Sequence, residues 1–257
     1  QAFKLYKKKF TLEKYDKNII SVFKMILSGK RQSTVRHVYT DLLRKTGKTY
    51  DPDPGVSDTV LIGSLVTRAI WMTRGLIRLQ RKIFMAAGVN IRGKNGLEIG
   101  DFSTIERGVQ IDGVAKNGVR LGKRVRIGAF TEISCTSHLS KLGQGLEIGD
   151  DSGIGAYSYI GASGGVKIGS NVITGQYVTF HAQDHVYDDP AQPIKDQGVT
   201  EQGIEIGDDC WVGAKVTFLD GAKVGNHCVV AAGAVVKGDF PDNVMIGGVP
   251  AKVIKKI

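Results

Sequence analysis

The chain has 257 residues, which is enough for one large domain or two modest ones. Its formal net charge of +10 favours anionic partners. The three cysteines are odd in number and form no CxxC pair, which favours a reduced protein over a disulfide-linked one. No secretory signal pattern opens the chain, so we expect a cytoplasmic protein.

Residues 1–90 are predicted to form a basic, helical N-terminal region. Residues 1–10 contain four lysines, and apolar residues recur at helical spacing over residues 16–28. A second helix is expected over residues 36–45. Residues 50–55, with the sequence YDPDPG, are rich in helix-breaking residues and are expected to form a linker.

Residues 57–84 are predicted to form a basic amphipathic helix. Ser57 or Asp58 can cap its N-terminus by accepting hydrogen bonds from backbone N–H groups of the first turn. No uninterrupted apolar run reaches the roughly 20 residues that a membrane-spanning helix needs. Two interpretations stay open: the helix lies on an anionic membrane surface, or it covers the open end of the domain that follows. The positive charges gather at Arg68, Arg74, Arg78, Arg81 and Lys82.

A period of six residues organises residues 206–241. The stretch divides into IGDDCW, VGAKVT, FLDGAK, VGNHCV, VAAGAV and VKGDFP, and five of these six hexapeptides begin with Ile or Val. This period fits neither an α-helix nor a half-buried strand. It predicts an all-β hexapeptide solenoid, a parallel β-helix in which one apolar residue per six points into a narrow core and each coil stacks on its neighbours.

The same period extends back to residue 97 with interruptions. Breaks at residues 113–118 and 139–145 predict loops that leave the coil. The largest interruption, residues 180–203, is polar and contains two prolines. We therefore place the repeat domain at residues 91–257, with an excursion loop at 180–203 of the kind that often carries function.

Two of the five histidines, His181 and His185, lie at the start of this loop. A neutral imidazole is a suitable general base for a hydroxyl or an amine near pH 7. We favour His185 as the base and keep His181 as the second candidate, with Asp184 as an orienting group; a loop histidine without a role is the alternative. A metal site is not expected, because the HxxxH spacing supplies only two ligands and neither HxxxxH nor CxxC occurs.

Residues 97–257 resemble the hexapeptide-repeat acyltransferases with a left-handed β-helix. The run GIEIGDDCWVGAKVTFLDGAKVGNHCVVAAGAVVKGDFPDNVMIGGVPAKVIKKI is similar to the galactoside, maltose and polysaccharide O-acetyltransferases, above all to the branch that acetylates bacterial surface glycans of the colanic-acid and O-antigen type. The resemblance implies a left-handed parallel β-helix, acetyl-CoA as the acyl donor, and a homotrimer with active sites between subunits.

The resemblance also implies roles for individual residues. His185, which ends the motif YVTFHAQDH, matches the family's general base, and the acceptor hydroxyl then attacks the thioester directly. Trp211 matches a residue of the acyl-CoA cleft, and an amide at Gly213 or Ala214 can stabilise the oxyanion. Ser163 and His181 are expected on the acceptor side, where residues 162–165 replace the acidic residue of the galactoside and maltose enzymes. The other expected cofactor contacts are Ala232, Gly233, Lys237, Lys252 and Lys255, the last two beside the CoA phosphates.

The leading hypothesis is therefore an O-acetyltransferase that acts on a bacterial polysaccharide or lipid-linked glycan at the inner face of the membrane, with peripheral membrane contact through residues 57–84. One alternative keeps the chemistry but changes the acceptor to a small soluble molecule such as serine, a sugar or an antibiotic. Another is a non-catalytic solenoid that binds an anionic polymer. Nucleic acid is not an expected partner, because no reader module or aromatic-interleaved basic motif occurs.

Overall fold

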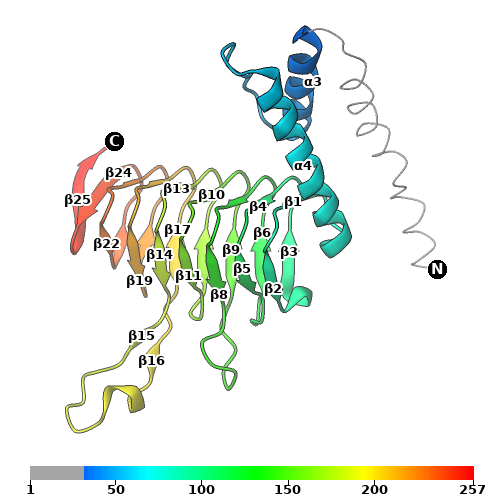
Figure 1. Cartoon of the computed structure of the whole chain (residues 1–257). Coiled ribbons are helices and arrows are strands. Elements are labelled where there is room, and N and C mark those ends of the chain that lie inside the picture. The colour runs from blue at the N-terminus through cyan, green and yellow to red at the C-terminus, as the bar shows by residue number, and fades with distance from the viewer. Residues whose placement is uncertain (1–31) are drawn as a thin grey trace. The chain divides into compact units, whose positions relative to one another are not determined.

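The computed structural model describes residues 32–257 and divides the chain into two compact units, residues 1–70 and residues 71–257. Figure 1 shows the helices of the first unit and the stacked strands of the second. The helix expected over residues 16–28 and the lysine-rich residues 1–10 lie outside the described residues.

The first unit contains α3 (Gln32–Lys45) and the beginning of α4 (Asp58–Leu79). The helix expected over residues 36–45 is confirmed as part of α3. The predicted linker that follows is held by Arg36, whose guanidinium donates hydrogen bonds of 3.0 Å to the carbonyl oxygens of Asp53 and Pro54. The breaker-rich sequence therefore ends one helix without leaving the chain unattached.

Helix α4 begins where the capping residues predict and ends earlier than expected. The Ser57 carbonyl accepts hydrogen bonds from the N–H groups of Val60 and Leu61, at 3.1 and 3.2 Å. The helix stops at Leu79 because Gln80 adopts a left-handed conformation with φ of 55°, so the predicted end at residue 84 is wrong. By length and composition α4 could cross a membrane, with a mean hydropathy of 1.3 over 18 residues, a test that mostly buried core helices of soluble proteins and signal sequences also pass; 17% of this window is buried.

The last turns of α4 belong to the second unit and pack on its first coil. A Cβ atom at Gly75 would lie 2.3 Å from the carbonyl oxygen of Ile83, so only glycine permits this approach. Arg74 donates to the carbonyl of Met85 at 3.1 Å, and Arg78 to that of Val89 at 2.9 Å. Both arginines thus satisfy backbone acceptors at the end of the coil. For residues 71–79 this geometry favours the interpretation that the helix covers the coil's open end.

The second unit consists of three sheets that the chain visits in turn, so that successive strands of one sheet are one coil apart (Figure 1). Sheet A contains β1 (Phe84–Met85), β4 (Thr104–Ile105), β7 (Arg126–Ile127), β10 (Gly153–Ile154), β13 (Ile173–Thr174), β18 (Trp211–Val212), β21 (Val229–Val230), β24 (Val244–Gly248) and β25 (Ala251–Lys256). Sheet B contains β2 (Asn90–Arg92), β5 (Gln110–Asp112), β8 (Glu132–Ser134), β11 (Tyr159–Gly161), β14 (Thr179–His181), β19 (Thr217–Leu219) and β22 (Val235–Val236). Sheet C contains β3 (Leu97–Ile99), β6 (Val119–Leu121), β9 (Leu146–Ile148), β12 (Val166–Ile168), β17 (Ile204–Ile206), β20 (Lys223–Val224) and β23 (Asp239–Phe240).

The pairing in all three sheets is parallel, except between β24 and β25. A parallel coil of hexapeptide repeats with few helices is therefore confirmed. The coil starts before residue 91, since β1 and β2 already pair with β4 and β5. Their sequence FMAAGVNIR carries no Ile-Gly pair, so the period was not visible there.

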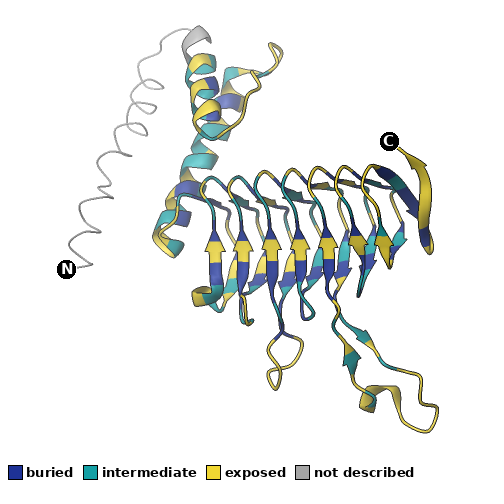
Figure 2. Cartoon of the chain, turned by 180° about the vertical axis from the view of Figure 1, so that it is seen from behind, coloured by how far each residue is buried: buried dark blue, intermediate teal, exposed yellow. Residues whose placement is uncertain are grey.

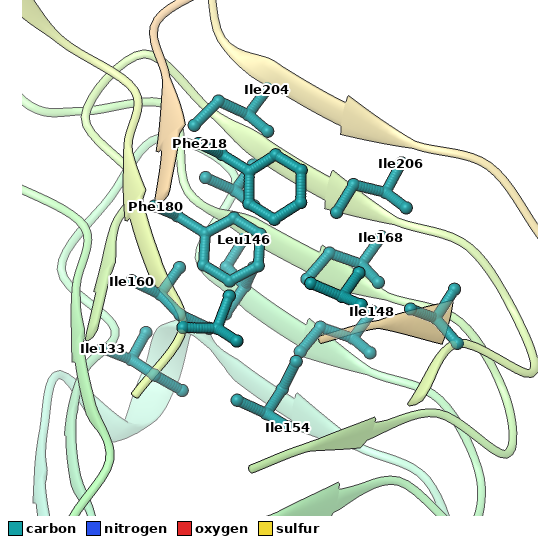
Figure 3. Packing of buried hydrophobic residues seen from close by; sticks show 14 of the residues in the cluster. Ile133, Leu146, Ile148, Ile154, Ile160, Ile168, Phe180, Ile204, Ile206 and Phe218 are labelled. Carbon is teal, nitrogen blue, oxygen red and sulfur yellow. The ribbon is translucent and has the colours of Figure 1, made fainter. Parts of the chain in front are cut away.

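The core is a single column of inward-facing side chains. The residues that open the six hexapeptides of 206–241 are all at most 4% exposed: Ile206, Val212, Phe218, Val224, Val230 and Val236. Figure 3 shows how equivalent residues of successive coils stack, with the ring of Phe180 lying against that of Phe218. The centroids of these two rings are 4.9 Å apart. The six-residue period thus translates directly into burial, at about 1.5–3 kcal/mol for each large side chain.

Two long loops project from the same edge of the coil, where the chain passes from sheet B to sheet C (Figures 1 and 2). The shorter loop joins β8 to β9, where a break was predicted. The longer loop joins β14 to β17 and corresponds to the predicted excursion at 180–203. It contains an antiparallel ribbon of β15 (Asp184–His185) and β16 (Val199–Thr200), with the 3-10 helix η2 (Ile194–Asp196) between them. A second 3-10 helix, η1 (Lys94–Gly96), lies between β2 and β3.

Candidate active site

The candidate base lies on the ribbon of the longer loop. His185 is opposite Val199 in the β15–β16 pairing, and its side chain is exposed. The ribbon leaves the coil at His181, which ends β14, and returns at Gly203, just before β17. The position of His185 therefore depends on what holds the two ends of this loop.

A buried carboxylate holds the returning end. Asp220 is only 1% exposed and follows β19 in the next coil. It accepts hydrogen bonds from the Thr200 hydroxyl at 2.9 Å, from the Gln202 N–H at 2.8 and 3.0 Å, and from the Gly203 N–H at 2.9 Å. Hydrogen bonds to an ionised acceptor are about twice as strong as neutral ones. Asp220 thus fixes β16 against the coil.

A salt bridge holds the outgoing end. Lys237 Nζ lies 3.2 Å from Asp184 Oδ2. Neighbouring residues of a strand point to opposite faces, so Asp184 and His185 face opposite sides of the ribbon. The structure therefore places Asp184 in contact with Lys237, and the orienting role expected for it stays a prediction.

The second candidate histidine lies on the outer face of sheet B. His181 is between Gly161 and Leu219 in register, and its ring is tilted against that of Tyr159 with the centroids 5.6 Å apart. Ser163 is 5% exposed, and its hydroxyl lies 2.5 Å from that of Ser137. Because Ser137 donates to Gln183 Oε1 at 2.9 Å, Ser163 is the donor in that pair, and it is Ser137 that links the shorter loop to the longer one.

These residues form what we call the loop-root cluster. It comprises Ser163, His181, Asp184, His185 and Lys237.

The expected cofactor residues gather on a different surface. Trp211 is 56% exposed on the outer face of sheet A. It is in register with Val229, which pairs with Met245, which in turn pairs with Lys255 on β25. At about 4.8 Å between strands, the indole and Lys255 are roughly 14 Å apart along one row. Lys252 and Lys255 are thus held on a hairpin strand that closes the coil.

Small residues border this row where the chain turns from sheet A to sheet B. A Cβ atom at Gly213 would lie 2.5 Å from the nitrogen of Ala232, so the two turns pack backbone to backbone. The Gly213 N–H already donates to the Val230 carbonyl at 2.8 Å, and the Gly233 N–H to that of Ala214 at 2.9 Å. Within residues 32–257, the N–H groups of Ala214 and Ala232 have no acceptor. Of the two amides expected at the oxyanion, the structure therefore leaves that of Ala214 available.

We call these residues the sheet-A cluster. It comprises Trp211, Gly213, Ala214, Ala232, Gly233, Lys252 and Lys255. One chain does not unite the two clusters, because the sheet-A cluster faces outward from sheet A and its turn into sheet B, whereas the longer loop leaves from the opposite edge of sheet B.

The described cysteines are poor candidates for a nucleophile. Cys135, Cys210 and Cys228 are free and at most 1% exposed. Burial raises the pKa of Cys135 to about 12 and that of Cys210 to about 11, so both thiols stay protonated at neutral pH. In the described part of the chain no three His, Cys, Asp or Glu side chains are grouped to hold a metal ion.

Asp220 was missed by the sequence analysis. It is the third residue of the hexapeptide FLDGAK, and Asp208 has the same place in IGDDCW. Asp208 is exposed, whereas Asp220 is buried and accepts hydrogen bonds from the returning end of the longer loop. No signal within the repeat distinguishes the two.

Comparison with known families identifies the repeats. Residues 203–238 match the bacterial transferase hexapeptide model of six repeats, and residues 145–175 match the hexapeptide repeat of succinyl-transferase. Two stretches of the coil are thus similar to the hexapeptide repeats of transferases. The resemblance drawn from the C-terminal run is thereby confirmed.

Relatives of this hexapeptide-repeat chain are named as acetyltransferases. Rv3034c of Mycobacterium tuberculosis, a probable acetyltransferase by name, is 35% identical over 137 residues, which are 53% of this chain and 44% of the relative. WbbJ of Escherichia coli, by name a candidate O-acetyl transferase of lipopolysaccharide biosynthesis, is 32% identical over 126 residues, 46% of this chain and 64% of the relative. The galactoside O-acetyltransferase of Escherichia coli is 34% identical over 92 residues, 36% of this chain and 44% of the relative. The chain thus spans between 44% and 64% of the length of these relatives.

Proposed function

We propose that this chain is an O-acetyltransferase that moves an acetyl group from acetyl-CoA to a hydroxyl group of a bacterial polysaccharide or lipid-linked glycan. The names of the relatives support acetyl transfer, and two of those names refer to O-acetylation connected with carbohydrate. The observation that carries the proposal is the sheet-A cluster, which joins an exposed indole, free backbone amides and two lysines on one surface.

The shape and charge of the sheet-A cluster suit a long, thin, anionic donor. Trp211 offers an apolar face, and the row from Trp211 to Lys255 runs roughly 14 Å along the coil at about 4.8 Å per strand. Lys252 and Lys255 can pair with the CoA phosphates at the far end. The small residues Gly213, Ala232 and Gly233 leave the turns without side chains that would block a pantetheine arm.

The proposed chemistry is a direct transfer. The imidazole of His185 takes the proton of the acceptor hydroxyl as its oxygen attacks the thioester carbonyl carbon. The tetrahedral oxyanion accepts a hydrogen bond from the free N–H of Ala214. The C–S bond then breaks, the carbonyl re-forms as an acetyl ester, and the imidazolium returns its proton to the leaving CoA thiolate. No acyl-enzyme is required, in agreement with the buried, protonated thiols.

We place the acceptor at the inner face of the cytoplasmic membrane. Residues 1–31 contain nine of the 35 Lys and Arg residues and two of the 25 Asp and Glu residues, so they carry +7 of the +10 net charge. In the first unit α4 exposes Val60 and Ile70, which are 60% and 50% accessible. A basic segment that precedes an exposed apolar helix face in the sequence suits peripheral contact with anionic lipid. Residues 71–257, with 21 basic and 19 acidic side chains, are nearly neutral, which disfavours a polyanion-binding coil.

We further propose a left-handed coil and a homotrimer, in which the ribbon of one subunit reaches the sheet-A cluster of the next. This arrangement is supported by the separation of the two clusters in one chain. It is also supported by exposed apolar side chains beside the sheet-A cluster, namely Ile173, Tyr157 and Tyr177, which are 50–57% accessible. Light scattering of the full chain should then give three times the monomer mass of 27.7 kDa.

The test measures acetyl ester formation and CoA thiol release with acetyl-CoA and purified lipopolysaccharide or capsular glycan. His185→Ala should lower kcat by roughly 10²- to 10⁴-fold, the range for loss of a general base. His181→Ala should have a smaller effect, and His138→Ala, in the shorter loop, is the matched control. Unchanged turnover of His185→Ala would refute the base assignment. Transfer only to serine, a free sugar or an antibiotic would replace the glycan with a small acceptor, and absence of CoA binding by calorimetry would refute the donor.

A further inference from the structure

A groove of about 210 Å³ crosses the beginning of sheet C over four coils, those of β6, β9, β12 and β17. Its lining residues include three that carry side-chain carboxamides, Asn117, Gln144 and Gln202. It belongs to neither the loop-root cluster nor the sheet-A cluster. At about 4.8 Å between strands, it runs roughly 14 Å along the coil axis.

The floor of the groove is backbone. Glycines with positive φ precede the sheet C strands in four successive coils, at Gly118, Gly145, Gly165 and Gly203, with φ between 66° and 115°. A Cβ atom at Gly145 would lie 2.2 Å from the carbonyl oxygen of Gly118. The backbones of adjacent coils therefore pack directly on one another along this column, and the side chain of Gln144 lies over Gly165.

The three carboxamides are unpaired. Within residues 32–257, the side-chain amides of Asn117, Gln144 and Gln202 have no hydrogen-bond partner. Each carboxamide offers two donors and an acceptor, a combination that matches neighbouring hydroxyl groups, which also donate and accept. Their backbones are fixed: the Gln144 N–H donates to the Ser163 carbonyl at 2.8 Å, and the Gln202 N–H to the Asp220 carboxylate. The amides are thus carried on ordered positions.

The charges along the groove cancel. Arg120 is in register with Glu147, Glu147 with Lys167, and Lys167 with Glu205. Alternation of this kind gives no net field for an anionic or a cationic polymer. The chemistry that remains is a neutral ligand rich in hydroxyl groups.

The groove also lies beside the loop that carries the candidate base. The shorter loop returns to the coil at Gln144 and the longer loop at Gln202. Gln202 and Thr200 of the ribbon bind the same carboxylate of Asp220. A chain in the groove would therefore run to the root of the ribbon.

We propose that this groove is a subsite for a neutral oligosaccharide, holding the part of a glycan acceptor remote from the hydroxyl that reacts. That the bound sugar is part of the acceptor rests on the proposed function. That a neutral oligosaccharide binds at all rests on the groove alone. Because the site recognises several sugar units, affinity should increase with chain length up to about three units, the number that roughly 14 Å accommodates.

The experiment compares the full chain with the triple variant Asn117→Ala, Gln144→Ala and Gln202→Ala. These substitutions remove only side chains, so the backbone bonds of Gln144 and Gln202 remain. Gln110→Ala, which removes an exposed carboxamide from sheet B, is the matched control. Calorimetry with maltohexaose and galactohexaose should show binding that weakens roughly tenfold or more in the triple variant and is unchanged in the control, since about three neutral hydrogen bonds are lost. Hexagalacturonate should bind no better than the neutral hexasaccharides.

Equal binding by the triple variant, tighter binding of hexagalacturonate, or no binding of either neutral hexasaccharide would each overturn the proposal. The assay of acetyl transfer is run separately on the same proteins. Transfer without any dependence on acceptor length would refute the groove and leave the proposed function standing. Amide-dependent hexasaccharide binding without acetyl transfer would refute the proposed function and leave the groove.

Discussion

The anchoring of the ribbon by Asp220 leads to the sharpest prediction. Asp220→Ala removes the carboxylate that bonds the returning end of the loop, leaving the N–H groups of Gln202 and Gly203 and the Thr200 hydroxyl without partners. A buried donor left unsatisfied costs about 1–3 kcal/mol, and the Thr200 hydroxyl can turn to water. The two backbone N–H groups together therefore cost about 2–6 kcal/mol.

Asp220→Asn should be much milder, at about 1 kcal/mol. The amide oxygen can still accept from both N–H groups, as Oδ1 does now at 2.8 and 2.9 Å. The amide nitrogen would take the place of Oδ2, where the Thr200 hydroxyl can accept instead of donate. The order of stability of the ribbon is thus Asp, then Asn, then Ala.

Hydrogen exchange with mass spectrometry measures this order directly. Peptides within residues 184–203 should exchange roughly thirtyfold faster or more in Asp220→Ala and about fivefold faster in Asp220→Asn, since about 1.4 kcal/mol is a factor of ten. Peptides of residues 206–236 should be much less affected, and kcat for acetyl transfer should fall in the same order. Asp188→Ala, an exposed carboxylate in the same loop, is the control. Faster exchange spread equally over the coil, or none in the ribbon, would contradict the anchoring argument.

Three further predictions follow from the packing, the thiols and the hairpin. Phe218→Ala should lower the free energy of unfolding, measured in urea, by about 3–5 kcal/mol, because the ring is fully buried against Phe180. Trp211→Ala removes an exposed side chain, so it should cost about 0.5 kcal/mol and raise the KM for acetyl-CoA instead. Equal losses of stability in the two variants would contradict the assignment of Phe218 to the core and Trp211 to the surface. The pKa of Cys210 rises on folding from 9.0 to about 11, so the contribution of the protonated thiol to stability is complete below pH 9 and is lost as the pH rises towards 11. Urea midpoints that stay constant from pH 8 to pH 10.5 would contradict this pH dependence. Lys255→Ala should raise the KM for acetyl-CoA roughly fivefold at low salt and much less at 1 M salt. Lys256 is on the opposite face of β25, so Lys256→Ala should leave this KM unchanged. Identical effects of the two substitutions would exclude a specific phosphate contact.

The sequence and the structure agree most closely where the fold is local. Every residue that opens a hexapeptide in 206–241 is buried, because the direction of a side chain within a coil depends only on its place in the six-residue period. The same reasoning found both loops as interruptions. It failed at the end of α4, where Gln80 stops the helix, and at residues 84–92, where the first coil lacks the motif.

The candidate site, in contrast, depends mostly on tertiary contacts that the sequence did not predict. His185 was selected from its place in the excursion loop and then matched by a resemblance, whereas Trp211 came from the resemblance alone, and the comparisons confirm the repeats without testing those two roles. The contacts that position the site lie far apart in sequence: Lys237 meets Asp184 at 53 residues' separation, and Asp220 binds Thr200 across 20 residues. The groove is formed by residues of four coils and of the returning ends of both loops. Because the two loops differ in length, the sequence alone does not show that these residues lie side by side.

By itself, then, the sequence determined the coil, its inward face and the position of the excursion along the chain, since a six-residue repeat encodes its own geometry. Only the tertiary structure decided which acid is buried, which amides stay free, and which surface each expected residue occupies. The physical reason is that the register between two strands depends on the length and path of the chain that joins them. Trp211 lies opposite Val229 because 18 residues make one coil, but it also lies opposite Ile173, 38 residues away, because the long loop returns the chain to the same row.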